Sequence, residues 1–266
     1  MKIGFIGLGH MAKAIIEGLL KANAVLSQDI YVHSAHEENY RKYAELHHLQ
    51  YCESNAAIVA QSDLLILAVQ PQQKASVVAE ITAELKSRSV PLVSLLSGVS
   101  IAELVDLIGQ QDFPIVRIMP NLNVKIGQGM TAIAANDAAQ GQAVAQTEEL
   151  FRQIGAVITL PEADFSTFVA LAGSAPAFVY LFIDALAHAG VKYGLTKKQS
   201  VEIVSQMMVG SAQLVQASGD APWNLIDEVA SPGGSTIAGI LAMQAAGFET
   251  AVAQAVDATI RKDLGE

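Results

Sequence analysis

Cysteine is almost absent from this sequence, since Cys52 is the only one among its 266 residues. A single cysteine excludes an internal disulfide and any zinc site built from several cysteines, and it is typical of a reducing compartment. We interpret Cys52 itself as a small, half-buried side chain. The expected location of the protein is therefore the cytoplasm.

Basic residues are also scarce, with 16 Lys and Arg against 26 Asp and Glu, a formal net charge of -10 and a charged fraction of 16%. Without a Lys- or Arg-rich tract, neither nucleic acid nor an anionic membrane is an expected partner. No run reaches the roughly 18 uninterrupted apolar residues of a membrane span, and Lys13 and Glu17 interrupt the first apolar segment. The 52% of hydrophobic residues instead predicts a globular protein with a small-molecule partner.

Strand-like and helix-like segments alternate along the first 160 residues. The predicted strands are residues 2–6, 29–33, 63–69, 90–96, 114–119, 129–136 and 155–160. The predicted helices between them are residues 11–22, 37–48, 72–85, 100–108 and 138–154. This rhythm predicts an α/β fold, a Rossmann-type doubly wound parallel sheet with helices on both faces.

After Pro161 the strand signal disappears, and the chain continues as long apolar helices broken by Gly and Pro. We therefore predict two domains, an α/β domain over residues 1–160 and an all-α domain over residues 161–266. Helices this apolar have little polar surface of their own, so we expect them to be buried against a second subunit in a homodimer or higher homo-oligomer. The alternative is a monomeric bundle of unusually apolar helices.

The segment "IGLGHMAKAI" places Gly7, Gly9 and Ala12 directly after the first strand and at the start of the first helix. This is the dinucleotide fingerprint with Ala in its third position. Gly7 permits a tight turn, Gly9 lets a pyrophosphate approach the backbone, and the start of the helix offers amide donors. The alternative is a simple turn.

The end of the second strand indicates whether the dinucleotide is NAD(H) or NADP(H). An NAD site places Asp or Glu there, whereas this chain has His33 and Ser34, with Glu37 and Glu38 slightly beyond. NADP(H) is therefore favoured, and NAD(H) is the second candidate. The rest of the cleft is expected from loops at the carboxyl ends of the later strands, with Gln70, Pro71, Ser97, Met119, Pro120 and Asn121.

Charged catalytic groups are missing from the predicted site. His188 is the one cationic candidate between Arg152 and Lys192, and the segment "AGSAPAF" offers only Ser174 as a polar side chain. No metal-binding constellation is visible, and His47 and His48 point in different directions on a helix. A dinucleotide with no charged base and no metal suits hydride delivery to an activated C=N bond.

The segment "VASPGGSTIAGILAMQ" introduces a helix with Pro232, Gly233 and Gly234, a stretch with almost no side chain. Taken alone, it favours a proline–glycine turn in which Ser235 or Thr236 caps the following helix.

Together with "IGLGHMAKAIIEGLL", "AVQPQ", "RIMPN", "GSAPAF" and "AHAGVKYGLT", this segment resembles the pyrroline-5-carboxylate reductase family over essentially the whole chain. Members of that family reduce 1-pyrroline-5-carboxylate to L-proline with NAD(P)H. The resemblance therefore implies this activity here. The alternatives are a reductase of another cyclic imine or of a β-hydroxy acid, and a non-catalytic sensor that binds NADP(H).

The resemblance also implies roles for individual residues. The dinucleotide would be held by Ile6, Gly7, Leu8, Gly9, His10, Met11, Ser34, Asn55, Ala68, Val69, Gln70 and Pro71. The imino acid would be held by Val229, Ser231, Gly233, Gly234, Ser235 and Thr236, with Ser174 from "AGSAPAF". Gly233 and Gly234 would present backbone N–H groups to its carboxylate, and Thr236, as the catalytic residue, would place its hydroxyl near the ring nitrogen.

Three departures from the family pattern concern this site. The family usually reads "SGSGPAY" where this chain has Ala172, Ala175 and Phe178, which affects the fit around the nicotinamide. It usually has Lys where this chain has Gln70, so a contact to a phosphate is lost. Leu95 and Leu96 replace a pair of smaller residues.

Overall fold

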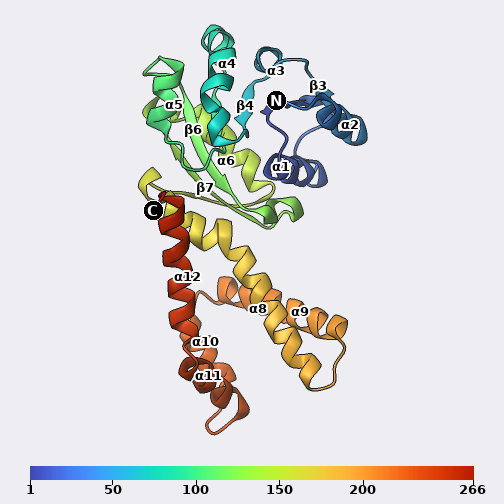
Figure 1. Cartoon of the computed structure of the whole chain (residues 1–266), viewed down its shortest axis with the longest axis vertical. Helices are drawn as coiled ribbons and strands as arrows, with labels where there is room; N and C mark the ends of the chain where they lie inside the picture. Colours follow the sequence, from blue (N-terminus) through green and yellow to red (C-terminus); the bar gives the residue numbers. More distant parts are fainter. The chain divides into compact units, whose positions relative to one another are not determined.

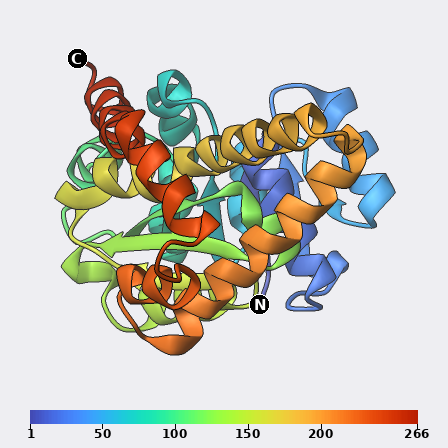
Figure 2. The same cartoon turned by 90° about the horizontal axis from the view of Figure 1, so that it is seen from below.

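The computed structural model describes all residues from 1 to 266 and divides them into two compact units. The first unit contains Met1–Gly173 together with Ile260–Glu266, and the second contains Ser174–Thr259. Figures 1 and 2 show the sheet of the first unit and the helices of the second.

An eight-stranded sheet in the order β3-β2-β1-β4-β5-β6-β7-β8 forms the centre of the first unit. Its strands are β1 (Ile3–Ile6), β2 (Ile30–His33), β3 (Gln50–Tyr51), β4 (Leu64–Leu67), β5 (Leu92–Ser94), β6 (Ile115–Pro120), β7 (Gly129–Ala135) and β8 (Gly155–Thr159). Every residue of β1 and β4 is buried, as expected for parallel strands that are covered on both faces. The predicted α/β fold with a Rossmann-type sheet is confirmed.

Helices cover both faces of this sheet (Figure 1). They are α1 (His10–Lys21), α2 (Glu37–His47), α3 (Asn55–Gln61), α4 (Lys74–Arg88), α5 (Ile101–Ile108), α6 (Gln142–Arg152) and the short α7 (Phe165–Phe168). Buried side chains of α1, α2 and α6 share one hydrophobic core, and those of α3, α4 and α5 share the other. The sheet is therefore a central layer between two helical layers.

The direction of β7 corrects the prediction of an all-parallel sheet. β7 pairs antiparallel with β6, with Ile118 opposite Ile133, while the other neighbours are parallel. Only Asn121–Gln128 lie between these two strands, and a parallel return needs a crossover of about a dozen residues or more. The strand was predicted over the correct residues, but its direction depends on this short connection.

Two small elements, α3 (Asn55–Gln61) and β3 (Gln50–Tyr51), have no counterpart among the predicted helices and strands. Helix α3 is short and begins at a side-chain cap, because the Ser54 hydroxyl accepts a hydrogen bond from the Ala57 N–H at 3.2 Å. β3 contains only two residues and pairs with β2. Both elements are too short for a periodic hydrophobic pattern to appear.

The second unit consists of α8 (Ala175–Lys192), α9 (Lys197–Ser218), α10 (Pro222–Val229), α11 (Ser235–Ala245) and most of α12 (Phe248–Asp263). α8 and α9 form a hairpin (Figures 1 and 2), and Thr196 with Gln199 caps the start of α9. Within this unit only Ala187 and Ser200 are buried. A single copy of the chain therefore gives its helical unit almost no core of its own.

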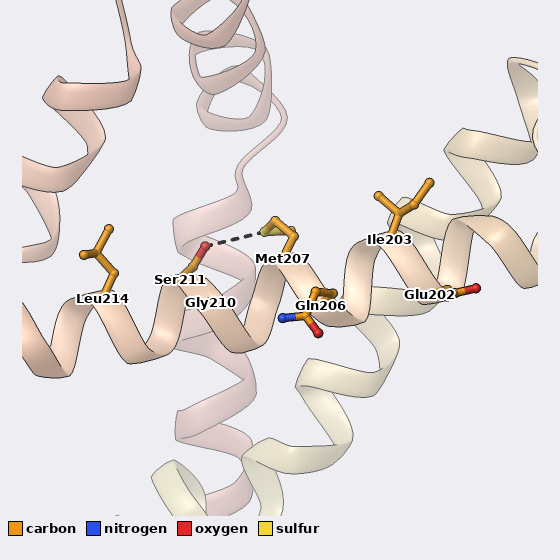
Figure 3. A pocket seen from close by; sticks show the side chains of 7 residues that line it. All are labelled: Glu202, Ile203, Gln206, Met207, Gly210, Ser211 and Leu214. Atoms are coloured by element: carbon orange, nitrogen blue, oxygen red, sulfur yellow. Dashed lines mark hydrogen bonds between the residues drawn. The ribbon is translucent and has the colours of Figure 1, made fainter.

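Large apolar side chains of this unit lie on its surface. Those with at least half of their surface exposed are Tyr180, Leu181, Tyr193, Ile203, Val209, Leu214, Trp223, Val229 and Leu241. Figure 3 shows one such face along α9, where Ile203, Met207, Gly210 and Leu214 recur at helical spacing around an open hollow of about 660 Å³. Exposed apolar surface of this extent marks an interaction site.

One helical stretch, Glu162–Lys192, is long and apolar enough to cross a bilayer by length and composition. The bent pair α11 and α12 would also qualify if it counted as one span. Only 6% of the most apolar window in Glu162–Lys192 is buried. A helix that meets a second subunit has the same composition, so this property does not identify a membrane segment.

A buried ion pair joins the sheet to the beginning of this helical stretch. Arg117 of β6 lies 2.7 Å from Glu162, and their side chains are 9% and 28% exposed. The same Glu162 oxygen accepts the backbone N–H of Ile101 at 2.9 Å, and the Arg117 guanidinium lies 4.8 Å from the centre of the Phe165 ring. Arg117 thus ties β6 to α5 and α7.

We predict that Arg117→Ala lowers the free energy of unfolding by about 2 kcal/mol, because it leaves Glu162 without its cation in a mostly buried position. The control is Lys42→Ala, which removes an exposed pair with Glu38 one helical turn away and should cost less than about 0.5 kcal/mol. Urea unfolding followed by circular dichroism at one protein concentration measures both values. Equal losses for the two variants would contradict the role of Arg117.

Candidate functional site

The loop between β1 and α1 has the backbone of an anion-binding turn. Gly7 has φ +95°, and a Cβ atom there would lie 2.5 Å from the Ala68 carbonyl oxygen. Gly9 is the N-cap of α1 without a side-chain cap, and a Cβ atom there would meet nothing within 4 Å. The first helical hydrogen bond runs from the Lys13 N–H to the Gly9 carbonyl at 3.1 Å, so the amides before Lys13 have no helical partner.

Gly7 is therefore needed by the fold, whereas Gly9 leaves open space in front of free amides. This is the cradle that a pyrophosphate requires, and a dinucleotide fits it. The sheet order places β1 between β2 and β4, which is the point where the chain reverses its direction across the sheet. The loop thus lies at the position where such folds bind their cofactor.

The other predicted cofactor residues follow neighbouring parallel strands. Ser34 follows β2, Ala68–Pro71 follow β4 and Ser97 follows β5, while Met119 and Pro120 end β6 and Asn121 follows them. Because β2, β1, β4, β5 and β6 are adjacent and parallel, their carboxyl ends meet at one edge of the sheet. These residues therefore share the edge that carries the glycine loop.

Three of the polar side chains predicted to bind the dinucleotide, Asn55, Ser97 and Asn121, have hydrogen-bond partners within the chain. The Asn55 amide donates to Glu80 at 2.6 Å, and the Ser97 hydroxyl donates to Asp263 at 3.2 Å. Asn121 is 6% exposed, donates to the Ala172 carbonyl at 3.0 Å and accepts the Met130 N–H at 3.2 Å. Their role as cofactor ligands stays a prediction, and for Asn121 the hydrogen bonds describe a structural role.

The end of β2 carries no free carboxylate. The Nδ1 atom of His33 lies 2.8 Å from the Cys52 carbonyl oxygen. Because a carbonyl oxygen only accepts hydrogen bonds, Nδ1 carries the proton. Glu37, in the first turn of α2, pairs with Arg41 at 2.8 Å. The Ser34 side chain makes no hydrogen bond within the chain and is available to a ligand. Burial raises the pKa of the Cys52 thiol, which keeps it protonated and unreactive at neutral pH.

The backbone at the start of α11 explains the two glycines of "SPGGST". Gly233 has φ +68°, and Gly234 is the N-cap without a side-chain cap. A Cβ atom on Gly234 would lie 2.5 Å from the Ser231 hydroxyl oxygen. The interpretation that Ser235 or Thr236 caps this helix is therefore wrong, because both residues lie inside α11.

The free donors at this helix start differ from those expected. The Gly234 N–H donates to the Ser231 carbonyl at 3.0 Å, so it is not free in this structure. The first helical hydrogen bond comes from the Ala238 N–H, which leaves the amides of Ser235 and Thr236 without helical partners. The Gly233 amide has no partner either. An anion at this point would meet these amides and the positive end of the helix dipole.

A hollow of about 360 Å³ lies beside this helix start within the second unit. Thr236 and Val229 are the predicted substrate residues that line it, and the Thr236 hydroxyl makes no hydrogen bond within the chain. Its other lining residues are mostly apolar, namely Ser211, Leu214, Val215, Pro222, Leu225, Ile226 and Ile240. Ser231, Gly233 and Gly234 lie in the adjoining loop and Ser235 begins α11, whereas Ser174 precedes α8 and does not line the hollow.

His188 lies outside this site, in a polar cluster with Asp184 and Lys197 that links α8 and α9. Its Nδ1 lies 3.0 Å from Asp184, and Lys197 lies 2.5 Å from the same carboxylate. The hydrogen bond from Lys197 holds the pKa of Asp184 below its usual value. His188 does not line the Thr236 hollow. No group of three or more His, Cys, Asp or Glu side chains in the chain is placed to hold a metal ion.

The segment "VALAGS" was expected to be an ordinary helix, and it is a π-helix over Val169–Ser174. Short π segments inside helices are frequent at functional sites. The Asn121 amide bonds the Ala172 carbonyl in this segment, next to the positions where the family pattern has other residues. The sequence signal for it is weak, because a single extra residue in a helical turn does not change the hydrophobic pattern visibly.

Comparisons with known proteins agree with this geometry. Residues 162–265 match the family model described as pyrroline-5-carboxylate reductase dimerisation, and residues 2–98 match the one described as NADP oxidoreductase coenzyme F420-dependent. The pyrroline-5-carboxylate reductase of Escherichia coli (strain K12) is 34% identical over 98% of this chain and 96% of its own. That of Synechocystis sp. is 34% identical over 100% of this chain and 99% of its own.

Solved structures give the same result. The 1-pyrroline-5-carboxylate reductase from Streptococcus pyogenes is 37% identical, with a TM-score of 0.87 and coverage of 100% of this chain and 99% of that one. The Plasmodium falciparum pyrroline carboxylate reductase, solved with NADP bound, is 30% identical, with a TM-score of 0.89 and coverage of 100% and 97%.

The two glycines of the first loop should respond differently to alanine. We predict that Gly9→Ala keeps the thermal stability of the protein but weakens dinucleotide binding about tenfold or more, because the new methyl group fills the open space. Gly7→Ala should instead lower the free energy of unfolding by about 1–2 kcal/mol, since its φ is left-handed. Melting temperature and dinucleotide Kd are measured for both variants. Unchanged binding in Gly9→Ala would mean that the loop is only a turn.

Proposed function

This chain belongs to the pyrroline-5-carboxylate reductase family, and from that premise we propose how its residues bind the two substrates. It is an NAD(P)H-dependent oxidoreductase that reduces the C=N bond of 1-pyrroline-5-carboxylate to L-proline, the last step of proline biosynthesis. The alternative hypotheses, a reductase of a β-hydroxy acid and a non-catalytic sensor, are not consistent with membership of this family. We propose that residues 1–160 bind the dinucleotide and residues 161–266 provide dimerisation and the substrate site.

The dinucleotide is placed in this proposal along the carboxyl edge of the sheet. The pyrophosphate meets the free amides at the start of α1, in front of Gly9. The bound dinucleotide would supply the hydride to the carbon of the C=N bond, and the imine nitrogen would bring its own proton. Residues of the chain hold and orient it, and the loops after β2 and β4 lie on the two sides of the glycine loop.

The imino acid is placed at the start of α11, and the uncapped N-terminus of that helix is the observation that carries this proposal. Its carboxylate is an anion, and the amides of Gly233, Ser235 and Thr236 are free donors at the positive end of a helix. The carbon atoms of its ring are apolar and suit the hollow of about 360 Å³ beside them. Carboxylate and ring are thus recognised by adjacent parts of one element.

Thr236 is the residue proposed to act on the ring nitrogen. Its backbone amide lies at the helix start while its side chain lines the hollow, so one residue faces both ends of the substrate. A free hydroxyl donates and accepts, so it serves the imine before reduction and the amine after it. With no charged base in the hollow, this hydroxyl is the polar group available to orient the nitrogen.

A second copy of the chain is proposed to complete this site. Ser211 and Leu214 line both the exposed α9 face of Figure 3 and the hollow beside Thr236. A partner helix that covers the α9 face therefore also closes the hollow and excludes water from it. We propose a homodimer or a higher homo-oligomer in the cytoplasm, without nucleic-acid or membrane partners.

NADPH is the proposed preferred dinucleotide. The end of β2 offers the free hydroxyl of Ser34, while Glu37 and Glu53 share an ion pair with Arg41 and Glu38 pairs with Lys42. No carboxylate there repels a 2′-phosphate or binds a ribose 2′-hydroxyl in its place. A solved relative, the reductase of Plasmodium falciparum, contains NADP.

The purified protein is expected to oxidise NADPH when 1-pyrroline-5-carboxylate is added, with proline as the product and with NADH less effective. We predict that Ser34→Asp raises the KM for NADPH about tenfold or more relative to that for NADH, by charge repulsion with the 2′-phosphate. Ser27→Asp, before the amino end of the same strand, is the control and should change neither value. If Ser34→Asp leaves the ratio unchanged, the preference is set elsewhere.

Thr236→Val keeps the shape of the side chain and removes its hydroxyl. We predict that it lowers kcat/KM for the imino acid about tenfold or more while dinucleotide affinity is kept, because only substrate orientation is lost. Thr236→Ser should restore most of the activity. Stopped-flow kinetics and dinucleotide titration measure the two effects. Wild-type kcat/KM in Thr236→Val would remove the hydroxyl from the mechanism.

A further inference from the structure

The last residue of α12, Asp263, contacts two separate segments of the first compact unit. One carboxylate oxygen accepts the Ser97 hydroxyl at 3.2 Å, and the other accepts the Ser166 hydroxyl at 2.7 Å. Ser97 follows β5 and Ser166 belongs to α7, and residues Ile260–Glu266 are part of the same compact unit. A single carboxylate near the C-terminus (Figure 1) thus bridges two elements that are distant in the sequence.

An acid at this position works against the local electrostatics. The last turn of a helix carries partial negative charge, so a carboxylate there is unfavourable, and Arg261 and Lys262 only partly offset it. The backbone around it is well defined, because the Leu264 N–H bonds Ile260 at 3.0 Å and the Glu266 N–H bonds Arg261 at 2.9 Å. The two serine hydrogen bonds are therefore the gain that explains an acid at this position.

The segment that Asp263 holds is one that the proposed cofactor site uses. The loop after β5 is anchored at Leu95, whose N–H bonds the Leu67 carbonyl at 3.0 Å, and at Leu96, whose N–H bonds the Ser94 hydroxyl at 3.3 Å. Ser97 beyond them is exposed, and its hydroxyl bonds only Asp263. Gly98 follows with φ +68° and open space around it. Ser97 and Gly98 lie between the buried side chains of Leu96 and Val99, and Asp263 is the one side chain that bonds this exposed tip.

We propose that Asp263 is a positioning residue for the dinucleotide. It fixes Ser97 at the carboxyl edge of the sheet, using α7 as its second support. The strand order puts β5 on the side of β1 opposite to β2, where the nicotinamide half of a dinucleotide lies when the adenosine half lies at β2. The clamp, defined as Ser97, Asp263 and Ser166, therefore orders the loop on that side of the proposed cofactor site, on whose placement this inference rests.

The first test compares Asp263→Ala with Asp263→Asn. Alanine removes both hydrogen bonds, and we expect the dinucleotide KM and Kd to rise about fivefold while the imino acid KM stays constant. Asparagine keeps the shape and can bond both hydroxyls, so it should remain within about twofold of the wild type. Asp257→Ala is the matched control, since this exposed aspartate of the same helix has no hydrogen bond or ion pair. A lower melting temperature with an unchanged dinucleotide KM in Asp263→Ala would overturn the proposal.

A double-mutant cycle shows which residue transmits the effect. If the clamp acts through Ser97, Asp263→Ala added to Ser97→Ala changes the dinucleotide KM no further, whereas independent effects would multiply and contradict the proposal. Should Asp263→Ala fail to fold, Ser166→Ala removes the outer support alone and is expected to raise the dinucleotide KM. A wild-type value there would contradict the clamp. If the proposed cofactor site were itself wrong, Gly9→Ala would bind the dinucleotide as tightly as the wild type does. This result distinguishes failure of the cofactor site from failure of the clamp.

Discussion

The chemistry of this protein depends on helix starts that are left without side-chain caps. A helix begins with amides that have no partner, and most helices satisfy one of them with a Ser, Thr, Asp or Asn side chain. Here α3, α5 and α9 do so, with Ser54, Ser100 and Thr196. Other helices have no such cap, and three of them, α1, α6 and α11, begin at a glycine, namely Gly9, Gly141 and Gly234. We propose that the starts of α1 and α11 bind the anionic groups of dinucleotide and imino acid.

Features encoded by local sequence could be predicted from the sequence alone, and features that depend on distant residues or on connection lengths could not. The strands and helices around Gly7 and Gly9 followed from buried apolar runs and amphipathic spacing, which local sequence encodes directly. The direction of β7 did not follow, because it depends on the length of the connection Asn121–Gln128. The π-helix at Val169–Ser174 did not follow either, since it keeps the apolar pattern of an α-helix.

At the candidate site, residue types were easier to predict than their hydrogen bonds. "SPGGST" indicated a need for bare backbone, but only the structure shows that the Gly234 N–H is used by Ser231 and that Gly233, Ser235 and Thr236 keep theirs. Asn121 was expected at the cofactor because of its place after β6, and its amide instead joins β7 to the π-helix. Asp263 gave no sequence signal, because its partners lie 166 and 97 residues away.

Binding of the substrate carboxylate by the backbone at the start of α11 is the interaction on which the proposed substrate site depends. A crystal structure of the protein with NADPH analogue and proline bound tests it most directly. We expect the carboxylate to lie within hydrogen-bond distance of the amides of Gly233, Ser235 and Thr236, with the ring nitrogen next to the Thr236 hydroxyl. A carboxylate held by a Lys or Arg side chain, with the start of α11 occupied only by water, would contradict it.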